Sequence, residues 1–194
     1  LALQLLLRAD LTMMQWSPSE KGPKLEILED GMVARNGGSL GECVRTMSPL
    51  PKQGVHRFRV LYEHDGHVAT LSAEGEGYLT GVLSSEYEGD DIFGKPNSLA
   101  TCPLFWGISE RDVIAAGERT SPQLPNEKDV LFSVKYGDVL ELIVNMDKHE
   151  LSFYWGDKNV DQPAHMMTPI TGLPSEVYIV ATPYHVGSTV RLDE

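Results

Sequence analysis

The sequence of 194 residues predicts an all-β fold made of many short strands, either a sandwich or a barrel. Two observations carry this prediction. The 18 glycines and 12 prolines are spread along the whole chain, and breaks this frequent favour short strands over long helices. Apolar residues also recur in short runs with a period of two, most clearly in residues 136–155, YGDVLELIVNMDKHELSFYW.

Residues 136–155 predict a β-hairpin with one buried face. Gly137 begins a turn, and 139–145 is an apolar run with the β-branched content of a buried strand. Polar residues 147–149 break the run, and apolar side chains then alternate with others along 150–155. We expect four side chains of this hairpin in the core: Leu142, Val144, Leu151 and Phe153.

The remaining elements follow in chain order. We expect a short amphipathic helix over residues 2–14, within an N-terminal segment 1–15, because its apolar residues fall on one helical face. Residues 16–23, WSPSEKGP, predict a connector at the start of a β-sandwich domain that extends to residue 194. Further strands are expected at 24–28, 32–35, 42–46, 55–63, 67–72, 77–83, 104–108, 130–135, 177–183 and 187–192, and the longest polar loop at 116–128.

The net charge and the cysteine content limit which classes of partner and which cellular compartment we expect. The net charge of -12 disfavours nucleic acid and anionic membranes and would steer basic peptides toward the chain. Cys43 and Cys102 are far apart and form no metal or disulfide pattern, so we expect two buried thiols in a reducing cytoplasm or nucleus. The start of the chain is too short for a membrane span and lacks a signal-peptide pattern, and we expect a fragment of a longer protein.

Several segments in order resemble the SPRY family. The hairpin 136–155 resembles its pattern of Gly-Asp, apolar strand, Asp, polar turn and Leu-Ser-Phe. GVHRFRV (residues 54–60) resembles its G-x-[HY]-x-[FW]-x-[VI] strand. The segments WSPSEKGPKLEILEDGMVAR, YLTGVLSS, LFWGIS and VYIVATPYHVGSTVRL resemble its entry hairpin, central strand, Trp-Gly segment and closing strands, and together they cover residues 16–194.

The resemblance implies a bent β-sandwich of two antiparallel sheets, a concanavalin-like jelly roll, that binds other proteins and has no catalytic activity. It also implies a partner surface on three loops at one end, which in the SOCS-box members hold a peptide and here match residues 34–39, 87–93 and 183–185. The expected partner-binding residues are Arg35, Asn36, Gly37, Gly38, Ser39, Tyr87, Asp90, Asp91, Phe93, Tyr184, His185 and Val186.

The residues themselves favour these loops as well. Glycine lets the first loop conform to a ligand, the acidic second loop supplies charge complementarity, and Tyr184 offers a rigid aromatic anchor. Where the SOCS-box members carry an Arg and a Trp, this chain has Ala34 and Tyr184, so we expect a different peptide specificity. The sequence contains no SOCS box, RING or B-box, so any ubiquitin-ligase role needs a further region.

Catalysis and metal binding have little support in the sequence. There is no nucleophile elbow, P-loop or dinucleotide motif, and we expect no enzyme activity and no cofactor. His64 and His67 lack further ligands, and the acidic run 86–91 lacks the spacing of a calcium loop, so no metal is expected. The interpretation is a monomeric module that binds a protein or peptide, and a carbohydrate-binding or carbohydrate-cleaving sandwich is the alternative left open.

Overall fold

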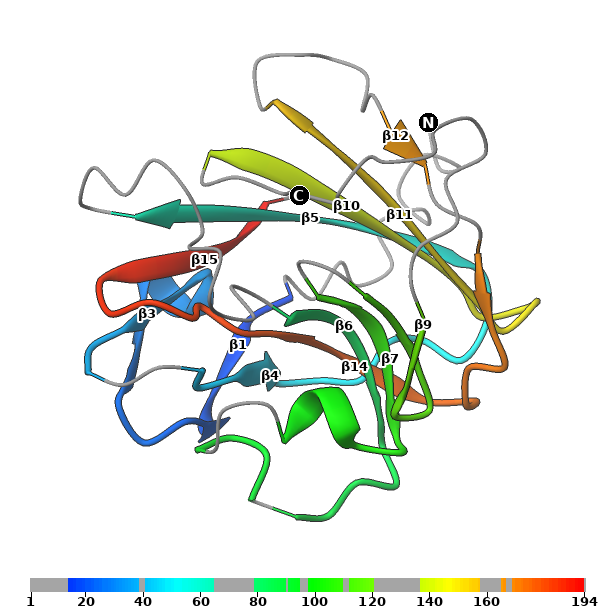
Figure 1. The fold of residues 1–194 in the computed structure, drawn as a ribbon, viewed down its shortest axis with the longest axis horizontal. Helices are drawn as coiled ribbons and strands as arrows, with labels where there is room; N and C mark the ends of the chain where they lie inside the picture. Colours follow the sequence, from blue (N-terminus) through cyan, green and yellow to red (C-terminus); the bar gives the residue numbers. More distant parts are fainter. Residues whose placement is uncertain are drawn as a thin grey trace, which may run out of the picture.

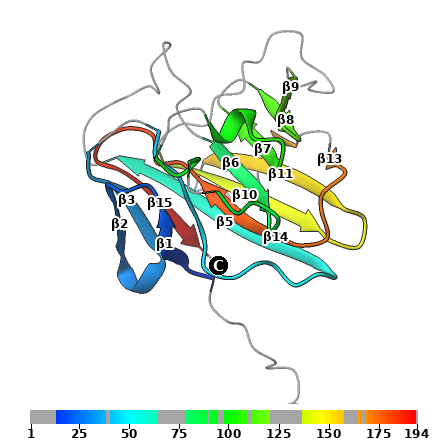
Figure 2. The same cartoon turned by 90° about the horizontal axis from the view of Figure 1, so that it is seen from below.

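The strands of the computed structural model form two antiparallel sheets that pack face to face (Figure 1). The structure describes residues 14–38, 41–64, 79–89, 91–94, 98–109, 112–120, 137–157, 165–166 and 169–193. Figure 2 shows the strands of both sheets running in similar directions, as in an aligned sandwich. The predicted all-β sandwich is therefore confirmed.

The seven-stranded sheet is made of strands from every part of the chain. Its order is β1 (Trp16–Lys21), β4 (Val44–Thr46), β14 (Val177–Ala181), β6 (Leu79–Ser84), β7 (Phe105–Ser109), β8 (Val113–Ala115) and β9 (Glu118–Thr120).

The eight-stranded sheet holds the predicted hairpin. Its order is β12 (His165–Met166), β11 (Glu150–Asp157), β10 (Asp138–Asn145), β5 (Val55–His64), β15 (Ser188–Asp193), β3 (Val33–Asn36) and β2 (Leu25–Leu28), with β13 (Ile170–Thr171) beside β11. Two short 3-10 turns, η1 (Glu29–Gly31) and η2 (Leu99–Thr101), connect strands.

The hairpin of β10 and β11 has the predicted register and buried face. Leu142 pairs with Phe153 and Val144 pairs with Leu151 across the two strands, and all four side chains are at most 1% exposed. Asn145 closes the turn because its side-chain oxygen accepts a hydrogen bond from the Lys148 backbone at 3.1 Å. The hairpin therefore supplies part of the main core, to which β2, β3, β5 and β15 of the same sheet also contribute.

A second apolar cluster lies on the opposite face of the seven-stranded sheet. The segment between β6 and β7 folds back across this face, below β6 and β14 in Figure 1. Its cluster consists of Cys43, Leu79, Leu83, Ile92, Phe93, Leu99, Ala100, Cys102, Phe105, Ile114 and Val180. Because both faces are covered, β6 is buried at every position, including its polar residues Thr80 and Ser84.

Two glycines allow β6 and β7 to approach closely. Gly81 and Gly107 pair directly across the strands, and a Cβ on Gly81 would lie 2.1 Å from the Trp106 carbonyl oxygen. A Cβ on Gly107 would lie 2.4 Å from the Phe105 ring. Neither position has room for a side chain without a backbone shift.

Two predicted segments differ from the structure. Residues 16–21, expected as a connector, form the edge strand β1, because Trp16 is fully buried and its indole N–H donates to the Val190 carbonyl at 3.2 Å. Pro18 is tolerated there because an edge strand has an unpaired side. The start of the predicted loop 116–128 is instead the turn and second strand of the β8–β9 hairpin, since Ala116 and Gly117 both have positive φ.

Other predictions concern residues that the structure does not describe. The helix expected at 2–14 lies outside the described residues except for Met14, which is not helical. The strands expected at 67–72 and 130–135 also lie outside them.

Candidate functional site

The three loops predicted from the sequence are joined at one end of the sandwich. The Asn36 side-chain amide donates to the carbonyls of Pro183 at 2.9 Å and Tyr184 at 3.1 Å. The Gly41 backbone N–H donates to the Tyr184 carbonyl at 3.2 Å, and the Cys43 N–H donates to the Phe93 carbonyl at 3.3 Å. The segment 36–43 therefore touches both of the other loops, although they are far apart in sequence.

Two of the predicted binding residues have buried side chains. Asn36 is 0% exposed and Phe93 is 5% exposed, the latter within the second apolar cluster. Their side chains do not form part of the surface in this structure, so the proposed contact surface leaves both of them out. Their role in this structure is to hold the loops.

The other predicted residues are placed as follows. Arg35, Gly37, Gly38, Asp91 and Val186 are exposed, with Val186 at 53%. Tyr87, Tyr184 and His185 are half-buried. Ser39 and Asp90 lie outside the described residues.

The turn that carries Tyr184, His185 and Val186 is fixed by hydrogen bonds to its backbone carbonyls and to Asn36. The Gly187 N–H donates to the Asn36 carbonyl at 2.7 Å, and the Ser188 hydroxyl donates to the His185 carbonyl at 2.6 Å. Gly187 has a φ of 85°, which glycine adopts without strain. These bonds leave Val186 projecting at the tip of the turn.

The rings on this turn form an edge-to-face series with a neighbouring strand. The Tyr184 and His185 ring centroids are 5.1 Å apart, and the His185 and His64 centroids are 6.5 Å apart. Burial, and to a lesser degree the neighbouring His64, lower the pKa of His185 from its usual value. The neutral imidazole is therefore favoured at pH 7.

An open hollow of about 500 Å³ lies beside this turn. Its lining is Arg35, Glu63, His64, Gly187 and Thr189. Thr189 of β15 pairs with Arg35 of β3 on one side and with Glu63 of β5 on the other. The three side chains therefore form one row across the outer face of the sheet.

Sequence reasoning did not find Glu63 and Thr189 as site residues. Both lie within ordinary strand patterns, and only the pairing of β3, β15 and β5 brings them beside Arg35. No local motif signals this pairing, because residues 35 and 189 are distant in the chain.

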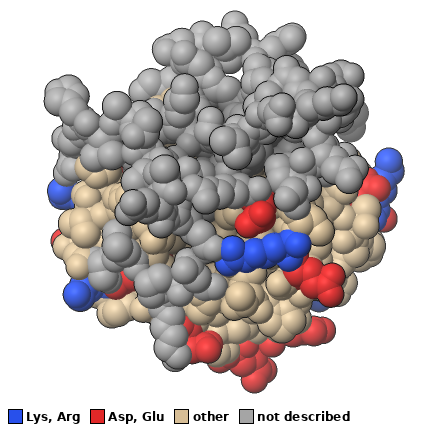
Figure 3. All heavy atoms as spheres, in the orientation of Figure 1, with Lys and Arg blue, Asp and Glu red and all other residues tan. Residues whose placement is uncertain are grey.

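The acidic second loop is held by Tyr87. Its hydroxyl donates to the Asp91 carboxylate and accepts the Ile92 backbone N–H at 3.3 Å. Burial, and then the hydrogen bond to the Asp91 carboxylate, raise the pKa of Tyr87. Glu86, Glu88 and Asp91 are exposed, and Figure 3 shows acidic side chains along the lower rim, where Figure 1 has the segment between β6 and β7.

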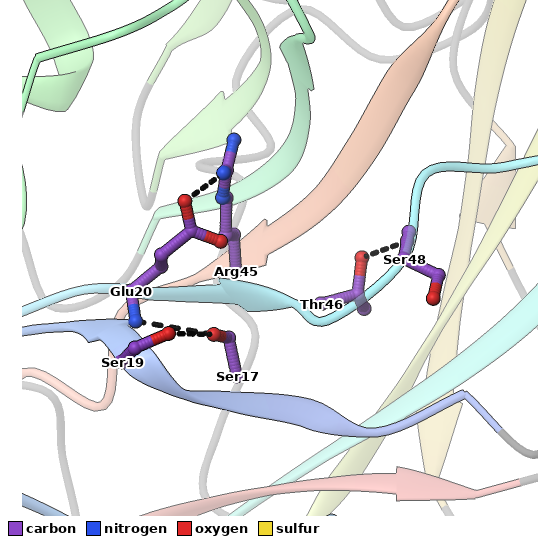
Figure 4. Close-up of polar contacts among 6 residues, drawn as sticks. All are labelled: Ser17, Ser19, Glu20, Arg45, Thr46 and Ser48. Atoms are coloured by element: carbon purple, nitrogen blue, oxygen red, sulfur yellow. Dashed lines mark hydrogen bonds and ion pairs between the residues drawn. The ribbon is translucent and has the colours of Figure 1, made fainter.

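A separate polar cluster ties the edge strand β1 to its neighbour β4 within the seven-stranded sheet (Figure 4). Arg45 of β4 forms an ion pair with Glu20 of β1 and lies 3.9 Å from the ring centroid of Tyr178. The Thr46 hydroxyl accepts the Ile179 N–H at 3.2 Å. These contacts hold β1, β4 and β14 together, which gives this cluster a structural role.

The described residues offer little to a metal or a membrane. They contain no group of three or more His, Cys, Asp or Glu side chains able to hold a metal ion. Among them there is also no helix long and apolar enough to cross a membrane. Cys43 and Cys102 are free and buried as expected, and burial raises the pKa of each thiol.

Comparisons with solved structures agree on the fold. The TRIM65 PSpry domain is 15% identical with a TM-score of 0.63, over 93% of this chain and 92% of that one. The human HERC1 SPRY domain is 16% identical with a TM-score of 0.61, over 92% and 97%. The chain has a SPRY-like fold.

The structural similarity to SPRY domains extends over most of the chain. The Drosophila melanogaster neuralized NHR1 domain is 16% identical with a TM-score of 0.57, over 93% of this chain and 98% of that one. No protein-family model and none of the curated proteins compared matches the sequence. At this level of identity the similarity concerns the fold, and function has to be argued from the chain's own residues.

Proposed function

We propose that residues 16–194 form a non-catalytic module that recognises a peptide or protein segment. The contact surface consists of Arg35, Gly37, Gly38, Tyr184, His185 and Val186, with the acidic loop 86–91 at its rim. The observation that carries the proposal is the hydrogen-bonded junction of three loops, in which buried Asn36 holds the Tyr184 turn and the Cys43 N–H holds the Phe93 carbonyl. A rigid sandwich that presents fixed loops of this kind suits partner recognition.

The exposed groups of this surface suit a protein ligand. Tyr184 offers an aromatic face beside the projecting Val186, and the ring of His185 supports Tyr184 from the side. Aromatic groups in fixed positions are the usual anchors of protein interfaces. The SPRY-like fold adds family-level support, because the family resemblance in the sequence implies protein binding at the same end.

The alternative of a carbohydrate-cleaving sandwich has weaker support. Glycoside hydrolysis needs two carboxyl groups facing one cleft. The described hollow is lined by a single carboxylate, Glu63. We therefore expect no hydrolytic activity from this chain.

A targeting role within a larger regulatory or ubiquitin-ligase protein is a further part of the proposal. The solved structures similar in fold include domains of TRIM65 and HERC1. This part depends on regions outside the 194 residues and is tested separately, by co-purification of the full-length protein with ligase components.

Two exposed valines make a matched test of the binding surface. Val186 is 53% exposed at the loop end, and Val55 is 54% exposed at the other end of β5. Peptides selected by display on the intact chain serve as the probe. Val186→Asp and Tyr184→Ala are each expected to weaken binding by about 2 kcal/mol, roughly 30-fold, whereas Val55→Asp leaves it unchanged.

Two results would contradict the loop end as the binding site. Binding that survives both loop substitutions, in variants that keep the circular dichroism of the parent, removes the loop end as the site. Loss of binding in Val55→Asp alone would move the site to the other end of the sandwich.

A further inference from the structure

We infer that the hollow beside the Tyr184 turn accepts a basic side chain, Lys or Arg, of the bound partner segment, with Glu63 as its anionic contact. The inference rests on the proposed function, because the hollow lies within the same loop end. It adds the chemical class of the partner, which the fold alone does not specify.

The side chains around Arg35 follow a fixed order across the sheet. Glu26 of β2 pairs with Arg35, Arg35 with Thr189, and Thr189 with Glu63, so all four share one row on the outer face. Neighbouring strands are about 4.8 Å apart, which places Glu26 one strand and Glu63 two strands from Arg35. An anion that approached Arg35 would therefore face a carboxylate on each side.

Glu63 lies two strands from Arg35 in this row, with Thr189 between them. Glu63 lines the hollow and is half-buried, so a cation that entered would lose part of its water and interact strongly with the carboxylate. The Thr189 hydroxyl adds a neutral acceptor beside it.

The exposed charges around the hollow are mostly acidic. The described strands and loops at this end carry exposed acidic residues at Glu26, Glu86, Glu88 and Asp91, and exposed basic residues at Lys24 and Arg35. The whole chain has a formal charge of -12. Such a field attracts basic segments and repels acidic ones.

His185 makes the same subsite sensitive to acid. His185 lies edge-on to His64, which lines the hollow, and the groups around it are Glu63, Arg35 and the ring of Tyr184. Protonation of the His185 imidazole adds a positive charge beside the hollow. A basic side chain in the hollow would then be repelled, so its binding weakens as the pH falls.

The test uses peptides selected by display on the intact chain and measured by fluorescence anisotropy. Selected peptides are expected to share a Lys or Arg whose replacement by norleucine weakens binding about tenfold. Glu63→Gln is expected to cause a similar loss, and in this variant the norleucine replacement has little further effect. Arg35→Gln is expected to tighten binding, because it removes a competing cation from the lining of the hollow.

Glu141→Gln is the matched control. Glu141 is also a strand carboxylate on the outer face of this sheet, but it does not line the hollow. It forms an ion pair with Arg57, with 3.2 Å between the guanidinium nitrogen and the carboxylate oxygen. This substitution is expected to leave binding unchanged. Its folding cost is small, because an ion pair with this exposure contributes little.

Several outcomes would overturn the inference. Selection of acidic peptides, loss of binding in Arg35→Gln, or equal affinities for Glu63→Gln and Glu141→Gln would each do so. If Tyr184→Ala abolishes binding while Glu63→Gln has no effect, the basic subsite is wrong and the loop surface stands. If Tyr184→Ala and Val186→Asp are both silent, the proposed function itself fails.

Discussion

Asn36 is the residue on which the loop end depends, and Asn36→Ala is the most informative single change. Its fully buried amide donates hydrogen bonds to the carbonyls of Pro183 and Tyr184, at 2.9 and 3.1 Å. Its side-chain oxygen accepts the Gly38 N–H at 3.1 Å. The substitution removes these three side-chain hydrogen bonds and leaves the backbone of position 36 in β3 unchanged.

The expected cost follows from the groups left behind. The Tyr184 carbonyl retains the Gly41 N–H as a donor, and Gly38 is exposed, so water can replace its lost acceptor. Pro183 is buried, so its carbonyl loses a donor where water is less available. An unsatisfied buried polar group costs about 1–3 kcal/mol, and with the small cavity we expect a loss of about 2–3 kcal/mol in unfolding free energy.

The assay is urea unfolding followed by tryptophan fluorescence, with Asn145→Ala as the control. Asn145 makes one side-chain hydrogen bond in an exposed turn, to the Lys148 N–H, and its loss should cost about 1 kcal/mol or less. Asn36→Asp should also destabilise, because it keeps the oxygen but removes the donor. Equal losses for the two alanine variants would refute the reasoning that Asn36 holds the loops together.

Three further predictions follow from burial and charge. Phe153→Ala is expected to lower the unfolding free energy by about 3–5 kcal/mol in urea titrations, because Phe153 is 1% exposed, and a loss below about 1 kcal/mol would contradict its place in the core. The lowered pKa of His185 means that the unfolded chain binds the proton more readily, so the His185 contribution should reduce stability as the pH falls below about 6.5. His185→Gln should flatten that part of the pH–stability profile, and an unchanged slope would count against it. Cys43 should resist a thiol reagent until the protein unfolds, because it is 1% exposed and its thiol pKa is raised, whereas rapid labelling of the native protein would show an open loop end.

Much of the fold can be predicted from local sequence patterns. The β10–β11 hairpin combines an apolar run, a polar turn and a period of two, and these signals need no knowledge of the rest of the chain. The edge strand β1 was harder to predict, since Pro18 and two serines look like a connector. Its strand is held in place by Trp16, whose side chain is fully buried. The hydrogen-bond partner of Trp16 is Val190, which is distant in the sequence.

The candidate site was only partly predictable for the same physical reason. The loops bearing Tyr184 and the acidic run could be chosen from composition, and they are joined in the structure. Whether Asn36 faces solvent or the interior depends on its strand register, which no local pattern specifies. Glu63 enters the site only through the pairing of β5 with β15.

The most direct test of the central claim is an amide chemical-shift map of the intact chain titrated with a display-selected peptide. The account predicts that the largest changes fall on residues 35–38, 86–91 and 184–189, with Glu63 and His64 included. Changes centred on Val55 and the far end of β5, with the loop end unaffected, would contradict it.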